Sequence, residues 1–134
     1  MLPFALEKLI FYAYKKGMMK MFGCVFCQIA DHKEPAAIVY EDEHCLALRD
    51  FNPKAPVHLL VIPRKHLPSL KEAQAGDEAL LGHLILLAAQ LARERGLESK
   101  GYRTLINNGT WAGQSVFHLH VHVLGGRAFH WPPG

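Results

Sequence analysis

The most regular pattern of hydrophobic and polar positions lies near the C-terminal end of the chain. Histidines and apolar residues alternate there, in the order His118, Leu119, His120, Val121, His122 and Val123. A period of two is typical of a strand with one buried face, and the pair Gly125-Gly126 is a stop signal. The pattern therefore predicts a strand within residues 116–126 that presents three imidazoles on one face.

Shorter apolar runs predict four further strands. They lie at residues 37–41, 45–50, 57–62 and 103–107. The joints between the first three strands are an Asp42-Glu43 turn and a loop with two prolines at 52–56. Parallel neighbours need a crossover of about a dozen residues or more, so these strands are expected to pair antiparallel.

One long helix is predicted between residues 77 and 95. Its apolar stripe comprises Leu80, Leu81, Leu84, Ile85, Leu87, Ala88 and Leu91. The stripe is wide enough to be buried on the sheet and against another subunit, and Gly96 is the residue expected just past the helix end. With a short helical turn at 24–29, the predicted fold class is α+β, an antiparallel sheet of about five strands with one long helix.

Length and charge limit the classes of function. A chain of 134 residues fits one domain with a real core. The formal net charge is +3, and the basic residues form no long run interleaved with aromatic residues, so we expect an anionic small molecule rather than nucleic acid. No apolar run reaches the roughly 18 residues of a membrane span, so no membrane partner is expected.

The chain has three cysteines, which do not suggest a disulfide framework. We expect a reducing, cytoplasmic location. Cys24 and Cys27 form a C-x-x-C pair, which in such a compartment indicates metal or redox chemistry. Cys45 is expected to be an ordinary residue of the strand core.

The first 23 residues differ from the rest of the chain. Apolar positions between Met1 and Tyr14 are interrupted by Glu7 and Lys8, which favours a short amphipathic helix over a signal peptide. We expect residues 1–23 to be an N-terminal extension and residues 24–134 to form the domain.

The loop that precedes the histidines, residues 107–115, offers candidate anion ligands. It contains two glycines and then Gln114 and Ser115. Backbone N–H groups beside glycines can form a nest for phosphate, although an ordinary hairpin loop fits the same residues. The neighbouring histidines favour the anion site, because imidazole titrates near neutrality and can act as a nucleophile. The chain has no G-x-S-x-G elbow and no Walker loop.

The three histidines are not expected to share one metal ion. Same-face residues of a strand are roughly 6.6 Å apart, which separates His118 from His122 by about 13 Å along the backbone. A zinc ion needs its nitrogen ligands at about 2.0–2.1 Å. The three rings are therefore expected to have different functions.

These motifs resemble those of a known family. The His-x-His-x-His pattern at 118–122 is similar to the signature of the histidine triad (HIT) superfamily. Further matching segments are 50–58, 61–66, 113–118 and the tail 125–134. Residues 24–134 together resemble the Hint branch, the purine nucleoside phosphoramidases, and residues 1–23 lie outside the resemblance.

The resemblance implies a HIT-like fold whose sheet extends across a homodimer. It also implies hydrolysis of the P–N bond of purine nucleoside 5′-phosphoramidates, of the AMP-amine or aminoacyl-adenylate type, through a covalent nucleotidyl-histidine. His120 would be the nucleophile, and His122 and Ser115 would contact the phosphate or the leaving group. His58 and Asn107 would support the ring and the phosphate. A neutral imidazole needs no metal or cofactor to attack phosphorus.

The same resemblance implies a site for a purine nucleotide, AMP or GMP, around the histidines. Asp50 would accept hydrogen bonds from the ribose hydroxyls. An apolar slot would hold the base and discriminate weakly between the two purines. The implied nucleotide-binding residues are Val25, Phe26, Ile29, Asp50, Asn107, Gly113, Gln114, Ser115, His120 and His122.

Many bacterial members of the branch with a C-x-x-C pair bind a structural zinc ion. The ligands that this implies are Cys24, Cys27, His66 and His118. Two cysteines and two histidines make a closed tetrahedral zinc set. The alternative is that the thiols are small buried residues and that no metal is bound.

Two other functions stay open. One is dinucleoside polyphosphate hydrolysis, as in the Fhit branch, which the Hint-like tail disfavours. The other is a nucleotide-binding interaction module with vestigial activity, which the presence of His120, Ser115 and Asn107 disfavours.

Overall fold

The structure is a computed structural model, and it describes residues 23–134. The helix expected near the N-terminus lies outside the described residues. The described helices and strands are α2 (Val25–Ala30), β1 (Ile38–Glu41), β2 (Cys45–Arg49), β3 (Val57–Pro63), α3 (Glu78–Glu94), β4 (Arg103–Leu105) and β5 (Val121–Gly125). Three short 3₁₀ turns lie in the connections, namely η1 (Leu70–Glu72), η2 (Ala75–Asp77) and η3 (Thr110–Ala112).

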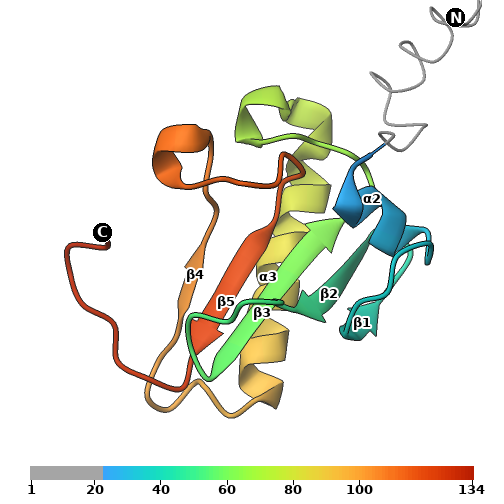
Figure 1. Cartoon of the computed structure of the whole chain (residues 1–134). Coiled ribbons are helices and arrows are strands. Elements are labelled where there is room, and N and C mark those ends of the chain that lie inside the picture. Colours follow the sequence, from blue (N-terminus) through green and yellow to red (C-terminus); the bar gives the residue numbers. More distant parts are fainter. Residues whose placement is uncertain (1–22) are drawn as a thin grey trace, which may run out of the picture.

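The five strands form one sheet in the order β1-β2-β3-β5-β4 (Figure 1). Each neighbouring pair is antiparallel. The predicted α+β fold, with one antiparallel sheet and one long helix, is therefore confirmed. The histidine strand is shorter than the alternation suggested, because pairing between β3 and β5 stops at Val61 and Val121. His118 and His120 consequently lie in the segment that leads into β5.

The two faces of the sheet bury different sets of side chains. Successive residues of a strand point to opposite faces, and both faces of β2 and β3 are buried. One face packs against α3 through Cys45, Ala47, Leu59, Val61, Val121 and Val123. The other face packs against α2 through Leu46, Leu48, Leu60 and Ile62. The long and the short helix therefore lie on opposite sides of the sheet.

Helix α3 ends where the sequence predicted. Gly96 adopts a left-handed φ of +71°, which an L side chain disfavours, and the N–H of Leu97 donates to the carbonyl of Ala92 at 3.0 Å. This is the hydrogen-bond pattern of a glycine-terminated helix. By length and composition alone the helical stretch Ala75–Glu94 is long and apolar enough to span a membrane. Core helices of soluble proteins pass the same test, and α3 packs its buried residues against the sheet.

The β1–β2 turn is fastened to α3 by one carboxylate. Asp42 accepts hydrogen bonds from the backbone N–H groups of His44 and Cys45, each at 2.8 Å. The Nε2 atom of His83, on α3, lies 2.6 Å from the same carboxylate. Cys45 is fully buried, and burial raises the pKa of its thiol to about 12. It is a neutral residue of the strand core.

Candidate functional site

A pocket of about 270 Å³ opens on the α2 side of the sheet. Its lining comes from α2, the end of β2, β3, the loop after β4 and the histidine segment. The lining residues are Val25, Phe26, Asp50, Phe51, Leu60, Asn107, Gly113, Ser115, Val116, His120 and His122. A larger hollow of about 440 Å³ lies beside Lys65 and Lys71, but among the described residues it lacks the paired histidines of the smaller one.

Most of the residues that the sequence singled out for a nucleotide meet in this pocket. His58 does not line it but lies beside His122 on the same face of the sheet, with its Nε2 2.8 Å from Nδ1 of His122. Sequence reasoning missed Phe51, Leu60 and Val116. Phe51 directly follows Asp50, Val116 directly follows Ser115, and the strand alternation puts Leu60 on the face of His58. Sequence adjacency to a predicted residue or strand alternation would therefore have identified all three.

Two predicted nucleotide ligands are not brought to the pocket. Ile29 lies on the inner side of α2 and is fully buried in the core. Gln114 turns inward, where its amide donates to the carbonyls of Pro68 at 2.7 Å and Val116 at 3.1 Å. These expectations are corrected, because one side chain completes the core and the other holds the loop together.

The glycine loop is a turn with its own internal hydrogen bonds. The N–H of Gly113 donates to the carbonyl of Thr110 at 3.0 Å, and the N–H of Gln114 donates to the carbonyl of Gly109 at 3.1 Å. These two amides are therefore used within the loop and do not form the expected phosphate nest. Ser115 lines the pocket and is exposed.

His120 has one nitrogen committed to the backbone. Its Nδ1 lies 2.8 Å from the carbonyl oxygen of His118. A carbonyl only accepts, so Nδ1 carries the proton and the neutral ring has its lone pair on Nε2. Burial lowers the pKa of His120, and the ring is only 7% exposed. Near neutral pH the ring is therefore uncharged, with the chemistry of a nitrogen nucleophile.

The proton on His122 is fixed through His58. The backbone N–H of Lys54 donates to Nδ1 of His58 at 3.0 Å, so the proton of neutral His58 lies on Nε2. That nitrogen is 2.8 Å from Nδ1 of His122, which must then accept. The proton of neutral His122 is therefore on Nε2. Among the described residues that buried Nε2 has no hydrogen-bond partner.

Both rings of this pair are held neutral. Burial, followed by the nearby charges of His120 and His58, lowers the pKa of His122 to about 4. Burial also lowers the pKa of His58, although the carboxylate of Asp50 acts in the opposite direction. The ring centroids of His120 and His122 are 4.9 Å apart. One pocket thus holds a nitrogen lone pair next to a nitrogen donor.

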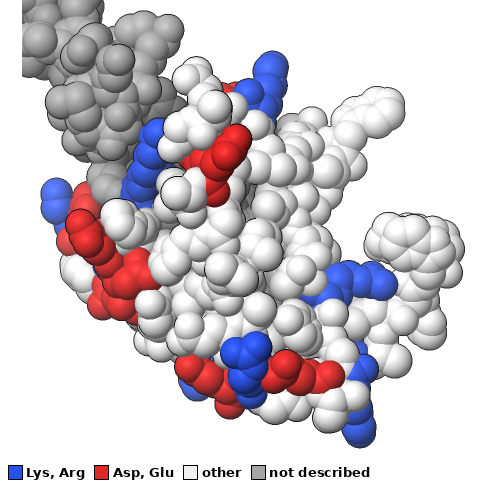
Figure 2. All heavy atoms as spheres, turned by 180° about the vertical axis from the view of Figure 1, so that it is seen from behind, with Lys and Arg blue, Asp and Glu red and all other residues white. Residues whose placement is uncertain are grey.

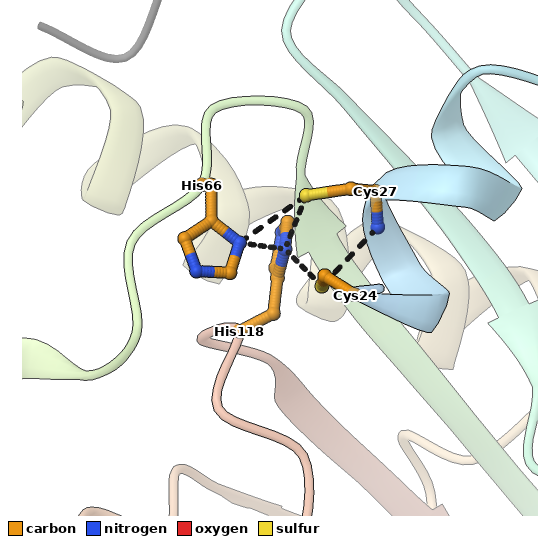
Figure 3. A group of neighbouring side chains, drawn as sticks. All are labelled: Cys24, Cys27, His66 and His118. Atoms are coloured by element: carbon orange, nitrogen blue, oxygen red, sulfur yellow. Dashed lines mark hydrogen bonds between the residues drawn. The ribbon is translucent and has the colours of Figure 1, made fainter. Parts of the chain in front are cut away.

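A second cluster lies beside the pocket and gathers the four predicted metal ligands. Figure 3 shows the two cysteines of the α2 segment, the histidine after β3 and the histidine before β5 pointing toward one another. Nδ1 of His118 lies 3.4 Å from Sγ of Cys24, 3.5 Å from Sγ of Cys27 and 3.1 Å from Nδ1 of His66. Sγ of Cys27 lies 3.2 Å from Nδ1 of His66.

These residues fit a tetrahedral metal ion. Zinc bonds of about 2.0–2.3 Å put neighbouring ligand atoms roughly 3.3–3.8 Å apart, close to the distances in the cluster. Nε2 of His118 lies 2.7 Å from the carbonyl of Pro63, so its Nδ1 carries a lone pair toward the cluster. Hydrogen bonding to Cys27, opposed by burial and helped by both histidines, lowers the pKa of the Cys24 thiol to about 2. The cluster therefore allows a zinc site.

The cluster and the pocket share helix α2. Cys24 and Cys27 belong to the cluster, and Val25 and Phe26 between them line the pocket. The ring of Phe26 meets His120 edge-on, with ring centroids 5.2 Å apart. A group held at the four-residue cluster would therefore also hold one wall of the pocket.

Known proteins are similar to this chain in sequence and in architecture. The family model described as HIT domain matches residues 31–129. An uncharacterized HIT-like protein of Synechocystis is 56% identical over 110 residues, which are 82% of this chain and 96% of that protein. A HIT family hydrolase from Legionella pneumophila has a TM-score of 0.82 and 45% identity, over 84% of this chain and all of that one. A zinc-bound histidine triad family protein from Mycobacterium smegmatis has a TM-score of 0.68 and 36% identity, over 78% and 76%.

We expect the ring of His122 to titrate near pH 4, measured by nitrogen-15 NMR of the labelled protein. An unfolded histidine titrates near 6.5, so the unfolded chain takes up this proton first as the pH falls. The free energy of unfolding should therefore decrease from about pH 6.5 toward pH 4, and it should decrease less in His122→Asn. A midpoint near 6.5 for His122 would contradict the argument from burial.

Proposed function

Because the chain belongs to the HIT domain family, we propose that it hydrolyses the P–N bond of purine nucleoside 5′-phosphoramidates. The observation that carries this proposal is that two ring nitrogens of one pocket differ in protonation. His120 offers a lone pair on Nε2, and His122 offers a proton on Nε2. The Hint-like tail supports the phosphoramidase branch.

In the first step the Nε2 lone pair of His120 attacks the α-phosphorus and forms a P–N bond to the ring. The bond from phosphorus to the leaving amine breaks, and its electron pair stays on the amine nitrogen, which takes a proton from solvent. His122 donates its Nε2–H to the phosphate or the leaving atom and stabilises the charge that develops there. The product of this step is a nucleotidyl-histidine.

In the second step water attacks the same phosphorus. The bond to His120 breaks, its electron pair returns to Nε2, and the proton lost by water goes to solvent. The products are the 5′-nucleotide and the free enzyme. The protein contributes position and electrostatics, and the reaction needs no metal at the phosphorus.

The other residues that line the pocket bind the ribose, the base and the phosphate of the nucleotide. Asp50 is half-buried and lines the pocket, and its Oδ1 accepts a hydrogen bond from the N–H of Asn52 at 2.7 Å, which restrains the carboxylate. In this proposal the carboxylate accepts hydrogen bonds from the ribose hydroxyls. Val25 and Phe26 form one apolar side of the slot for the base, and Leu60 adds to it. Ser115 and Asn107 contact the phosphate. The slot offers a purine apolar contact without distinguishing adenine from guanine.

The metal cluster holds a structural zinc ion in this proposal. Cys24, Cys27, His66 and His118 would be the ligands, and the ion would supply no reaction step. It would tie α2 to the segments before β5 and after β3. The proposal is supported by the ligand geometry, by the lowered pKa of the Cys24 thiol and by the hydrogen bond from Nε2 of His118 to the carbonyl of Pro63.

The protein also forms a homodimer in this proposal. Figure 2, which views the molecule from behind Figure 1, shows a broad face whose centre carries few charged side chains. On the outer side of α3, Ile85 is 47% exposed and Leu86 is 72% exposed. Strand β4 is an edge strand of three residues, and an open edge favours pairing with a second sheet.

Replacing the nucleophile tests the reaction. We expect His120→Ala to lower turnover of a fluorogenic adenosine phosphoramidate by about a hundredfold or more, the scale of losing a principal catalytic group. His44→Ala, an exposed histidine outside the pocket, is the matched control and should keep wild-type turnover. Mass spectrometry should detect a nucleotidyl adduct on wild type and none on His120→Ala.

The outcomes separate the three candidate functions. Turnover of phosphoramidate above that of diadenosine polyphosphate supports the proposal. Preferential turnover of the polyphosphate would replace it with the second hydrolase function. Nucleotide binding without turnover of either would leave an interaction module.

Metal analysis tests the cluster. We expect about one zinc ion per chain in wild type, the stoichiometry of a four-ligand site, with strong depletion in His118→Ala and Cys27→Ser. Cys45→Ala changes the cysteine outside the cluster and should retain the metal. Equal zinc content in all three variants would show that the metal is not held by these ligands.

Sedimentation tests the dimer. We expect wild type to sediment as a dimer and Leu86→Glu to sediment as a monomer, because a buried carboxylate opposes an apolar interface. Lys33→Glu, an exposed change just after α2 on the opposite side of the sheet, is the control and should stay dimeric. A monomeric wild type at micromolar concentration would overturn this part of the proposal.

A further inference from the structure

The segment that follows β5 packs against the loop beneath the histidines. Gly126 has a φ of +89°, and a Cβ added to it would lie only 2.8 Å from Cβ of Pro56. Both the conformation and the close approach require glycine at this position. The start of the C-terminal tail is thereby held directly against residues 50–57.

Arg127 makes the next contact with the same loop. Its Nε donates to the carbonyl oxygen of Lys54 at 3.1 Å. Its guanidinium carbon lies 4.3 Å from the ring centroid of Phe129, a stacking contact that restrains the otherwise flexible side chain. The tail thus reaches the backbone of the loop through two neighbouring residues.

Lys54 connects this contact to the pocket through its main chain. Its carbonyl accepts from Arg127, and its N–H donates to Nδ1 of His58. That N–H places the proton of His58 on Nε2. It thereby places the proton of His122 on its own Nε2, which has no hydrogen-bond partner within residues 23–134. The position of the Lys54 main chain therefore decides whether Nε2 of His122 is a hydrogen-bond donor in the pocket.

We propose that Arg127 is a positioning residue, which holds Lys54 so that His58 and His122 both carry their protons on Nε2. Its kinetic consequence rests on the proposed phosphoramidase function, but the placement of the protons does not. Arg127 lies outside the lining of the pocket and acts through Lys54 alone.

The other pair of tautomers for His58 and His122 shows why the position of the Lys54 N–H matters. Without the N–H of Lys54, the proton of His58 can occupy Nδ1. Nε2 of His58 then accepts from Nδ1 of His122, and Nε2 of His122 becomes a lone pair. The pocket would present two acceptors to a phosphate and lose its donor. Asp50, whose Oδ2 lies 3.5 Å from Nε2 of His58, favours the original proton position, so the loss is partial.

Nitrogen-15 NMR of the histidine rings in the full chain tests this directly. We expect wild type to show Nε2-protonated tautomers for His58 and His122 at neutral pH, and Arg127→Ala to show a mixture of tautomers for both. Arg127→Lys keeps a donor for the carbonyl of Lys54 and should restore part of the wild-type pattern. Thermal unfolding should show that each variant is folded.

Arg103→Ala is the matched control. Arg103 also fastens the tail, since its Nη2 donates to the carbonyl of His130 at 2.9 Å and its guanidinium carbon lies 5.2 Å from the Phe129 centroid. Within residues 23–134 Arg103 makes no hydrogen bond to Lys54, so its removal should leave the tautomers unchanged. A change as large as that of Arg127→Ala would assign the effect to the tail as a whole and overturn the proposal.

Kinetics give the second readout. One well-placed donor contributes about a hundredfold or more to kcat, and with Asp50 still present we expect Arg127→Ala to lose about tenfold. KM should change little, because the lining residues stay in place. Unchanged tautomers in Arg127→Ala overturn the inference whatever the kinetics show. Failure of wild type to cleave phosphoramidates would overturn the proposed function and leave the NMR result to decide this inference.

Discussion

Main-chain hydrogen bonds to imidazole nitrogens are the interaction on which the site depends. The carbonyl of Pro63 accepts a hydrogen bond from Nε2 of His118, and the carbonyl of His118 accepts one from Nδ1 of His120. The N–H of Lys54 donates a hydrogen bond to Nδ1 of His58. A carbonyl only accepts and an N–H only donates, so the backbone decides where each ring carries its proton. Side chains of one type thereby become a candidate ligand, a lone-pair nucleophile and a donor within a few residues.

The histidine rings of the pocket lie together because their residues point to the same face of the sheet. Residues of β3 and β5 that point away from α3 meet α2, so His58 and His122 lie on the same face as the apolar wall of the pocket. Helix α2 has only six residues, too few to be stable alone. Its own core contacts and the cluster at its two cysteines hold it in place. Order at the four-residue cluster and order at the pocket wall are therefore physically linked.

The sequence predicted much of this arrangement. The strand alternation, the long apolar stripe and the short joints predicted the antiparallel sheet and α3, and the strand spacing predicted separate functions for the three histidines. It was wrong about Ile29 and Gln114. An apolar residue in a short helix fits a core as well as a slot, and a glutamine in a loop finds backbone carbonyls as readily as a ligand. Which of these surroundings it meets depends on segments far away in the chain.

The sequence by itself determined which residues alternate, where the helix ends and which side chains have metal-binding or nucleophilic chemistry. These properties depend on local periodicity and residue type. Only the tertiary structure decided which ring nitrogens carry protons, which loop amides are hydrogen-bonded within the loop and that Arg127 reaches the carbonyl of Lys54. His58 and His122 are 64 positions apart in the chain, and Arg127 lies 73 positions from Lys54. Hydrogen bonds between such distant residues form only when the sheet has brought their backbones together.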